Sequence, residues 1–344
     1  MDHMERFYAT IERRKVDRPC SWLGIPDTRA YPNLYSYFQV NSMHELIVQL
    51  DDDMVPVEMP YHSPTSNAIY MAFAFAKKGI IDEAHRTLTA PGFFEDMTDP
   101  ARVDDFDWPD PAKYIDPAEC RQVVEDVPPG RAVLGVIWSA HFQDACAAFG
   151  MENALLQMYT APEMFRAVIG RIEQFYLRAN EIFFEATRGK LHAILIGNDF
   201  GGQRGLMLAP DKIREFAFPG TRHFIQQAKS YGVKVIHHSC GGIRDIIPDL
   251  IEMGADAINP IQALAAGMEP KGLKRDFGDQ VAFCGGVDAQ NLMVNGTPEQ
   301  VRQKVRELKK IFPTGLILSP SHETILFDTP PANVEAMFQA IQEK

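Results

Sequence analysis

The hydrophobic and polar positions along the chain form short apolar runs separated by longer segments with helical spacing. The clearest runs, rich in β-branched residues, predict strands at residues 133–138, 192–197, 233–238, 256–259, 281–284 and 316–319. A further run, residues 19–25, predicts a first strand near the N-terminus. Near-continuous apolar strands that alternate with helices indicate a parallel sheet covered on both faces.

The segments between these runs carry helix-terminus signals. Thr160 and Thr297 each precede a Glu or Gln by three residues, the spacing of a capping box, and predict helix N-termini. Gly254 predicts the C-cap of a helix over residues 243–253, in which Pro248 indicates either a kink or a late start. Thr329, followed by two prolines, predicts the start of a last helix over residues 332–343.

Residues 90–117 are rich in Asp and Pro and predict a long surface excursion rather than another strand–helix repeat. No low-complexity linker divides the chain, and no G-x-G-x-x-G follows a predicted strand. We therefore expect residues 1–344 to form a single α/β domain, a (β/α)8 TIM barrel with an elaborated N-terminal region. A doubly wound sheet is the structural alternative.

Charge and composition narrow the class of partner. The formal net charge of −12 and the absence of a basic stripe argue against nucleic acid. No apolar stretch approaches the roughly 20 residues of a membrane-spanning helix, and the polar start shows no secretory signal. Five scattered cysteines do not form a disulfide framework, so we expect a cytoplasmic protein.

Polar side chains follow five consecutive predicted strands at the point where each strand ends. In a barrel these carboxyl ends share one face, where catalytic groups collect. The residues concerned are Asp199, Gln203, His238, Cys240, Asn259, Gln262, Asp288, His322 and Glu323.

His238 and Cys240 are the sharpest pair in this set. Residues i and i+2 of an extended segment point to the same side, so the imidazole and the thiol could share one metal. Zinc accepts both donors, and a catalytic zinc site uses about three protein ligands, with His322 as the expected third. His237 should face the helices, and Cys284 is a rival ligand within its strand. The alternative is a buried cysteine beside a hydrogen-bonded core histidine.

Other polar residues near the strand ends are candidates for catalysis or substrate binding. Asp199, Asp288 and Glu323 are candidate catalytic carboxylates. Candidate substrate-binding residues are His141, Gln203, Asn259 and Gln262, and Trp138 could line the same mouth. Hydrogen bonding at the barrel rim is the alternative role for these side chains.

Over nearly its whole length the chain resembles the uroporphyrinogen decarboxylase superfamily. The matching segments include ERFYATIERRKVDRPCSWLGI, GVKVIHHSCG, GADAINPIQALAAGMEPKGL, NGTPEQVRQKV and the closing SPSHETILFDTPPANVEAM. The resemblance implies a (β/α)8 barrel and two alternative chemistries, decarboxylation of a tetrapyrrole acid or corrinoid-dependent methyl transfer.

Departures from the decarboxylase pattern favour the methyltransferase branch. In the segment after Trp22, where decarboxylases keep an arginine-rich stretch, Arg29 alone remains, and Pro60 stands about where they carry an aspartate. The methyltransferases share the metal-binding H-x-C that His238 and Cys240 match. Their third ligand is a cysteine, where this chain has His322, so the resemblance implies either a His/Cys/His site or one completed by Glu323.

The resemblance thus implies a zinc-dependent methyltransferase that moves a methyl group between a corrinoid, carried by a partner protein, and a thiol or a small methylated or methoxylated substrate. One alternative is a metal-free decarboxylase that uses Asp199, Asp288 or His322 as proton donor. Another is a non-catalytic module that binds a corrinoid or a metal. No nucleic-acid or membrane partner is expected, and assembly as a homodimer is left open.

Overall fold

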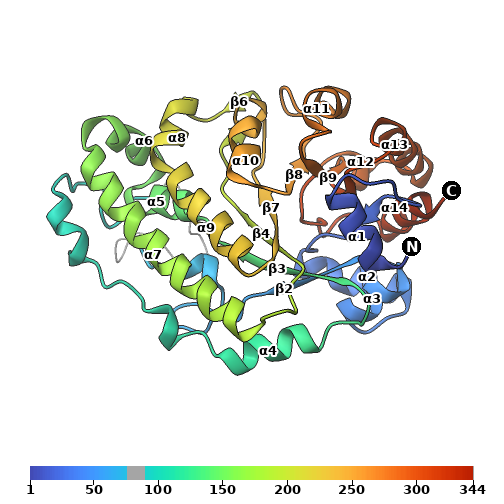
Figure 1. Cartoon of the computed structure of the whole chain (residues 1–344), viewed down its shortest axis with the longest axis horizontal. Coiled ribbons are helices and arrows are strands. Elements are labelled where there is room, and N and C mark those ends of the chain that lie inside the picture. The colour runs from blue at the N-terminus through green and yellow to red at the C-terminus, as the bar shows by residue number, and fades with distance from the viewer. Residues whose placement is uncertain (76–89, 344) are drawn as a thin grey trace.

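A computed structural model describes residues 1–75 and 90–343 of the chain. Eight parallel strands form one sheet in the order β1-β10-β9-β8-β7-β4-β3-β2, which curls into a nearly closed barrel (Figure 1). The strands are β1 (Cys20–Ser21), β2 (Met54–Glu58), β3 (Ala132–Trp138), β4 (Ala193–Gly197), β7 (Lys234–His238), β8 (Ala257–Ile261), β9 (Ala282–Val287) and β10 (Leu316–Pro320). The predicted α/β barrel is confirmed.

Helices follow most of the strands and cover the outside of the barrel, with α7 and α9 packed along one flank (Figure 1). The helices are α1 (His3–Ile11), α2 (Tyr31–Phe38), α3 (Met43–Gln49), α4 (Pro117–Glu125), α5 (His141–Phe149), α6 (Met151–Thr160), α7 (Pro162–Ala186), α8 (Pro210–Phe216), α9 (Phe218–Ser230), α10 (Ile247–Met253), α11 (Pro270–Phe277), α12 (Leu292–Asn295), α13 (Pro298–Ile311) and α14 (Pro331–Gln342). Within the described ranges, no helix combines the length and the apolar character needed to cross a bilayer.

Six predicted strands are present within a few residues of their expected limits. The first strand, β1, contains only Cys20–Ser21 instead of the whole predicted run. The pattern did not predict β2, where Pro56 interrupts a short run that follows three aspartates. A small antiparallel hairpin, β5 (Gly201–Gly202) with β6 (Gly205–Leu206), also lies in a segment that the pattern left as a loop.

Three of the four helix-terminus signals fit the structure, including Thr329, two residues before α14 begins at Pro331, and one does not. Thr297 forms the predicted capping box with Gln300, and Gly254 ends α10 in a left-handed conformation. Pro248 lies in the first turn of α10, so the helix starts late and is not kinked. Thr160 does not cap α7, because it is the last residue of α6 and its hydroxyl donates to the Leu156 carbonyl.

The Thr297 cap gives a first prediction. Replacing Thr297 by Ala leaves the Gln300 N–H without its side-chain acceptor, and we expect a loss of about 1 kcal/mol in the free energy of unfolding. Urea denaturation measures this loss, and Thr160→Ala is the control. Because the Thr160 hydroxyl accepts from no helix-terminal N–H group in the described residues, its removal should cost less than about 0.5 kcal/mol. Equal losses in both variants would contradict the assignment.

The core has two parts, one inside the barrel and one between the sheet and the helices. Side chains alternate along each strand, so Ala193 and Leu195 of β4 point inward while Ile194 and Ile196 face the helices. Helix α1 fills the amino-terminal end of the barrel with Phe7. Side chains therefore fill the amino-terminal end of the barrel, and a site is expected at the carboxyl-terminal face.

Residues 90–117 contain two 3-10 turns, Pro100–Asp105 and Pro111–Lys113. The segment is anchored by aromatic side chains, since Phe94 is fully buried and stacks near Trp108. Phe106 packs against both rings.

The seam between β1 and β2 is joined by carboxylates. Asp53, just before β2, accepts the backbone N–H of Ser21 at 2.8 Å, and Asp52 accepts that of Leu23 at 2.7 Å. Asp53 also binds Arg6 and Arg18, each at 2.6 Å, and all three side chains are buried. These bonds satisfy backbone donors in β1 and just after it, where no strand ladder to β2 is formed.

Candidate metal centre

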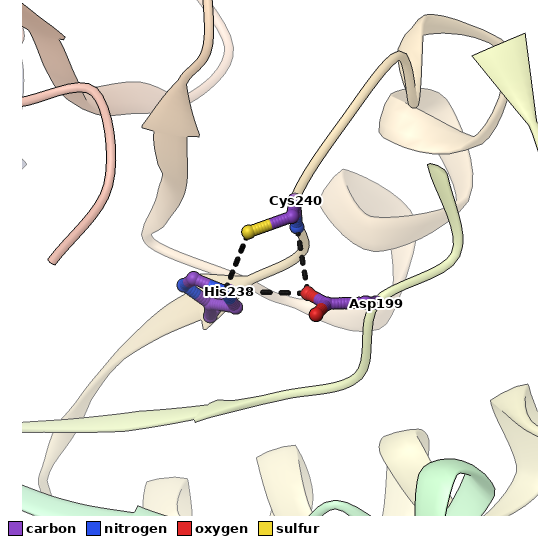
Figure 2. Close-up of side chains that lie close together, drawn as sticks. All are labelled: Asp199, His238 and Cys240. Carbon is purple, nitrogen blue, oxygen red and sulfur yellow. Dashed lines mark hydrogen bonds and ion pairs between the residues drawn. The ribbon is translucent and has the colours of Figure 1, made fainter. Parts of the chain in front are cut away.

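His238 and Cys240 come from the carboxyl end of β7. Ile236 belongs to the barrel interior, so by strand alternation His238 also points inward. Its Nε2 lies 3.4 Å from the Cys240 sulfur (Figure 2). His237 points the other way, is fully buried, and stacks near Phe200 on the helix side. The predicted sharing of one side by His238 and Cys240 is present in the structure.

Asp199, just after β4, completes a compact group with these two residues. Its Oδ1 lies 3.3 Å from His238 Nε2 and accepts the Cys240 backbone N–H at 2.8 Å (Figure 2). One ligand atom from each of Asp199, His238 and Cys240 lies within 4.8 Å of the others. The expected set was His238, Cys240 and His322, and the candidate triad of the structure contains Asp199 in place of His322.

Glycines allow the loops after β4 and β7 to touch. A Cβ atom on Gly201 would lie 2.8 Å from the Cys240 carbonyl oxygen, and one on Gly241 would lie 2.3 Å from the Gly201 backbone. Gly241 also has φ of +81°, which side chains disfavour. The two loops are joined by the Gly242 N–H, which donates to the Gly202 carbonyl at 2.9 Å. This close backbone contact brings Asp199 to Cys240.

His322 and Glu323, in the loop after β10, face the triad from the other side. The rings of His322 and His238 are 6.1 Å apart, edge to face. Glu323 Oε2 lies 3.5 Å from His238 Nδ1 and 3.3 Å from His322 Nδ1. This Oε2 atom is buried and has no hydrogen-bond partner among the described residues. A buried carboxylate oxygen of this kind, beside two imidazoles, is a further candidate donor to a cation.

Asn259 and Gln262 form hydrogen bonds that hold the site in place. Asn259 Oδ1 lies 2.7 Å from His238 Nδ1, which leaves Nε2 directed at Cys240 and Asp199. The Gln262 side chain accepts the Gly241 N–H at 2.7 Å. Partners of this kind orient metal ligands and fix the histidine tautomer. The expected contact of both residues with substrate stays a prediction.

Electrostatics favour a deprotonated thiol. Burial opposes ionisation of Cys240, but hydrogen bonds from His238 and His322 lower the pKa of its thiol below the usual value. Burial likewise opposes the charge on Asp199, yet His238 and the Cys240 N–H lower its pKa to about 2. Burial of His238 is outweighed by Glu323 and Asp199, which raise its pKa well above the usual value. The thiolate is the form that binds a metal ion.

Other predicted residues lie outside the triad. His141 is fully buried, with Nε2 at 2.8 Å from the Ala217 carbonyl and Nδ1 at 3.3 Å from that of Ser139. The Asp288 carboxylate accepts backbone N–H groups at the start of α12. Gln203 is exposed. Cys284 is buried in the barrel interior, where desolvation raises the pKa of its thiol to about 11.

A cavity of about 500 Å³ adjoins the triad. Glu323 and Trp138 line it, and so does Gln143, whose amide donates to Asp199 at 3.2 Å. Trp138 stands edge-on to the His238 ring, with centroids 5.5 Å apart. A register shift in β3 and left-handed φ values of 52° at Trp138 and Ser139 set this orientation. The sequence pattern gave no signal for this bulge.

The fold and the site together define a parallel α/β barrel with a candidate His/Cys/Asp metal centre where its strands end. A family model described as uroporphyrinogen decarboxylase (URO-D) matches residues 2–344. The chain belongs to this family.

Two comparisons found proteins that are named as methyltransferases. The chain is 24% identical over 209 residues to a protein of Methanosarcina mazei named methylated-thiol–coenzyme M methyltransferase. The match covers 60% of this chain and 52% of the relative, about half of the relative's length. A solved structure titled as a methyltransferase from Methanosarcina mazei superposes with a TM-score of 0.69 at 16% identity, covering 99% of this chain and 98% of the other. The relationship is distant, and the structural likeness bears on the fold alone.

Proposed function

We propose that this protein is a zinc-dependent methyltransferase that moves a methyl group between a corrinoid and a thiol or small methylated or methoxylated substrate. The observation that carries the proposal is the compact group of Asp199, His238 and Cys240, with His238 buried and the other two partly buried, beside a cavity at the carboxyl end of the barrel. The distant likeness to a methylated-thiol methyltransferase supports the same assignment.

The donor set fits zinc. Imidazole nitrogen, thiolate sulfur and carboxylate oxygen are the three ligand types that zinc uses in proteins. His238, Cys240 and Asp199 would hold the ion, with Glu323 or His322 available as a further donor. When bound, zinc would supply Lewis acidity that lowers the pKa of a thiol substrate.

The chain's own residues have separable roles in this proposal. Asn259 orients the His238 ring through Nδ1, and Gln143 steadies the Asp199 carboxylate. Trp138, packed against His238, shields the centre and forms part of the cavity wall. In the thiol-methylating direction, the thiol proton would pass to solvent and the substrate sulfur would bond to the methyl carbon, and the corrinoid would keep the electron pair of the carbon–cobalt bond that breaks. Holding the two reactants in line is the second contribution of such a site.

A cavity of about 500 Å³ beside the triad suits a small substrate. We therefore propose that the corrinoid is carried by a separate partner protein. Decarboxylation of a tetrapyrrole acid is less well supported by the cavity. Its described lining includes the carboxylates Glu58, Asp144 and Glu323 and no Lys or Arg to pair with acidic substituents.

Metal analysis and three parallel assays test the proposal. The purified protein should contain about one zinc per chain and should exchange methyl groups between methylcobalamin, free or protein-bound, and thiols. Uroporphyrinogen should be left unchanged. Retained zinc without transfer to or from any thiol, thioether or methoxylated compound would favour a binding module. Conversion of uroporphyrinogen by the metal-free protein would overturn the proposal.

Paired variants distinguish the third ligand. Asp199→Asn removes a carboxylate within reach of both His238 and Cys240, and we expect zinc affinity to fall at least about tenfold. His322→Gln should have the smaller effect, because His322 lies outside the compact triad. Competition with a chromogenic chelator measures both affinities. A larger loss in His322→Gln would restore the His238, Cys240 and His322 set expected from the sequence.

A further inference from the structure

The charged side chains among the described residues that line the cavity beside the metal centre are all carboxylates. Among the described residues that line it, three carry carboxylates and none is Lys, Arg or His. Asp144 accepts the Tyr176 hydroxyl at 2.6 Å, and Glu323 faces His238 and His322. Glu58 forms no hydrogen bond or ion pair with any described residue, so it is the carboxylate left for a ligand.

Glu58 is placed to meet a substrate rather than to hold the fold. It is the last residue of β2, at the carboxyl end of the barrel, and its side chain is exposed to the cavity. It also borders two smaller adjoining cavities. Desolvation by the surrounding walls raises the pKa of Glu58 above its usual value. A bound cation would stabilise the ionised carboxylate, because a nearby opposite charge favours the charged form.

Aromatic walls add a second preference for positive charge. Tyr70 and Trp138 line the cavity together with Glu58, and both rings also border the small cavity next to it. The faces of such rings attract ammonium groups, more strongly where water is excluded. Trp138 in turn contacts His238, so the same wall reaches from Glu58 to the metal centre.

On the basis of the proposed function, we infer that the substrate is a thiol or thioether whose non-reacting end carries a positive charge, such as an ammonium group. Its sulfur would approach Cys240 and His238, and its cationic end would lie against Glu58, Tyr70 and Trp138. A substrate with a sulfonate or carboxylate end would instead meet Glu58 with no cation in the described lining to offset the repulsion.

Three thiols that differ only in their end group test this inference. The zinc-loaded protein is titrated calorimetrically with 2-aminoethanethiol, 2-mercaptoethanol and 2-mercaptoethanesulfonate, which carry a cation, a neutral group and an anion. We expect the amine to bind about tenfold more tightly than the alcohol, and the sulfonate about tenfold more weakly. A three-carbon aminothiol in the same titration allows for the span between sulfur and charge.

The variant Glu58→Gln separates the role of this carboxylate from the different acidities of the thiols. It should reduce amine binding about tenfold while leaving binding of the alcohol unchanged. Glu252→Gln, an exposed position on α10 far from the cavity lining, is the matched control and should change neither. Circular dichroism checks that both variants fold.

The outcomes separate the two proposals. If the sulfonate binds as tightly as the amine, or if Glu58→Gln leaves the ratio of amine to alcohol binding unchanged, the charge inference is overturned while the methyltransferase proposal stands. If none of the thiols binds to the zinc-loaded protein, the charge inference is overturned, and the methyl-transfer assays with thioethers and methoxylated compounds then decide the proposed function separately. The expected order, lost selectively in Glu58→Gln, supports both.

Discussion

Replacing Cys240 by Ser is expected to abolish zinc retention and methyl transfer. A serine hydroxyl is close to a thiol in size, but it stays protonated at neutral pH and is a poor zinc ligand. In the native protein, His238 and His322 lower the pKa of the Cys240 thiol and so favour the thiolate that a metal ion requires. We expect zinc affinity to fall more than about 100-fold, beyond the effect of removing an outer partner.

Metal analysis after dialysis against a chelator measures the loss, with methyl exchange assayed on the same samples. Cobalt substitution gives a second readout, because a thiolate bound to Co²⁺ adds a charge-transfer absorption that Cys240→Ser should lack. This signal reports ligation even when no substrate has been identified.

The matched control is Cys284→Ala. Cys284 also lies on a strand that ends at the barrel mouth, but its thiol is fully buried, lies 3.4 Å from the Ser319 hydroxyl and has a pKa raised to about 11. We therefore expect this variant to keep its zinc. Loss of zinc from Cys284→Ala together with retention by Cys240→Ser would exchange the roles of the two cysteines and contradict the triad.

The sequence could predict the barrel because its strands are short, apolar and regularly spaced. The same periodicity placed His238 and Cys240 on one side, since alternation along a strand needs no tertiary information. The seam strands were harder to predict. In β2, Pro56 weakens the strand pattern, and in β1 the ladder is so short that carboxylates satisfy part of its backbone.

The third member of the triad depends on contacts that no local pattern encodes. Asp199 reaches Cys240 only because the glycines after β4 and β7 let two backbones touch. Asn259 is a candidate substrate contact from its position at a strand end, and its register opposite His238 on β7 also makes it a hydrogen-bond partner of that ring. Strand-end position alone cannot separate these roles.

A second large effect is expected at the seam between β1 and β2. Asp53 is fully buried and binds Arg6, Arg18 and the Ser21 N–H, so Asp53→Asn leaves two buried guanidinium groups short of a partner. Removing one member of a buried ion pair typically costs about 3–5 kcal/mol. Arg6 keeps Asp17 and Arg18 keeps Asp51, so we expect a loss of about 3 kcal/mol in the free energy of unfolding.

The destabilisation caused by Asp53→Asn should depend on pH. Burial opposes ionisation of Asp53, but His3, Arg18 and Arg6 hold its pKa below the usual 3.8. Its stabilisation is therefore present at pH values above about 4 and is lost as the pH falls through the lowered pKa. The difference between wild type and Asp53→Asn should be largest near neutral pH and should shrink in acid. Urea denaturation at pH values from about 3 to about 8 measures this difference in the free energy of unfolding.

The neighbouring carboxylate, Asp52, serves as a control because it should show the opposite pH trend. Desolvation raises the pKa of Asp52 to about 7, so the ionised form of Asp52 destabilises the fold increasingly as the pH rises from its usual pKa of 3.8 toward 7. Asp52→Asn removes that term, and its free energy of unfolding should fall less between pH 5 and 8 than that of the wild type. Two adjacent aspartates that bind the same strand should therefore give variants with opposite pH trends. Parallel trends in Asp52→Asn and Asp53→Asn would show that the seam is not held by an ionised Asp53 beside a protonated Asp52.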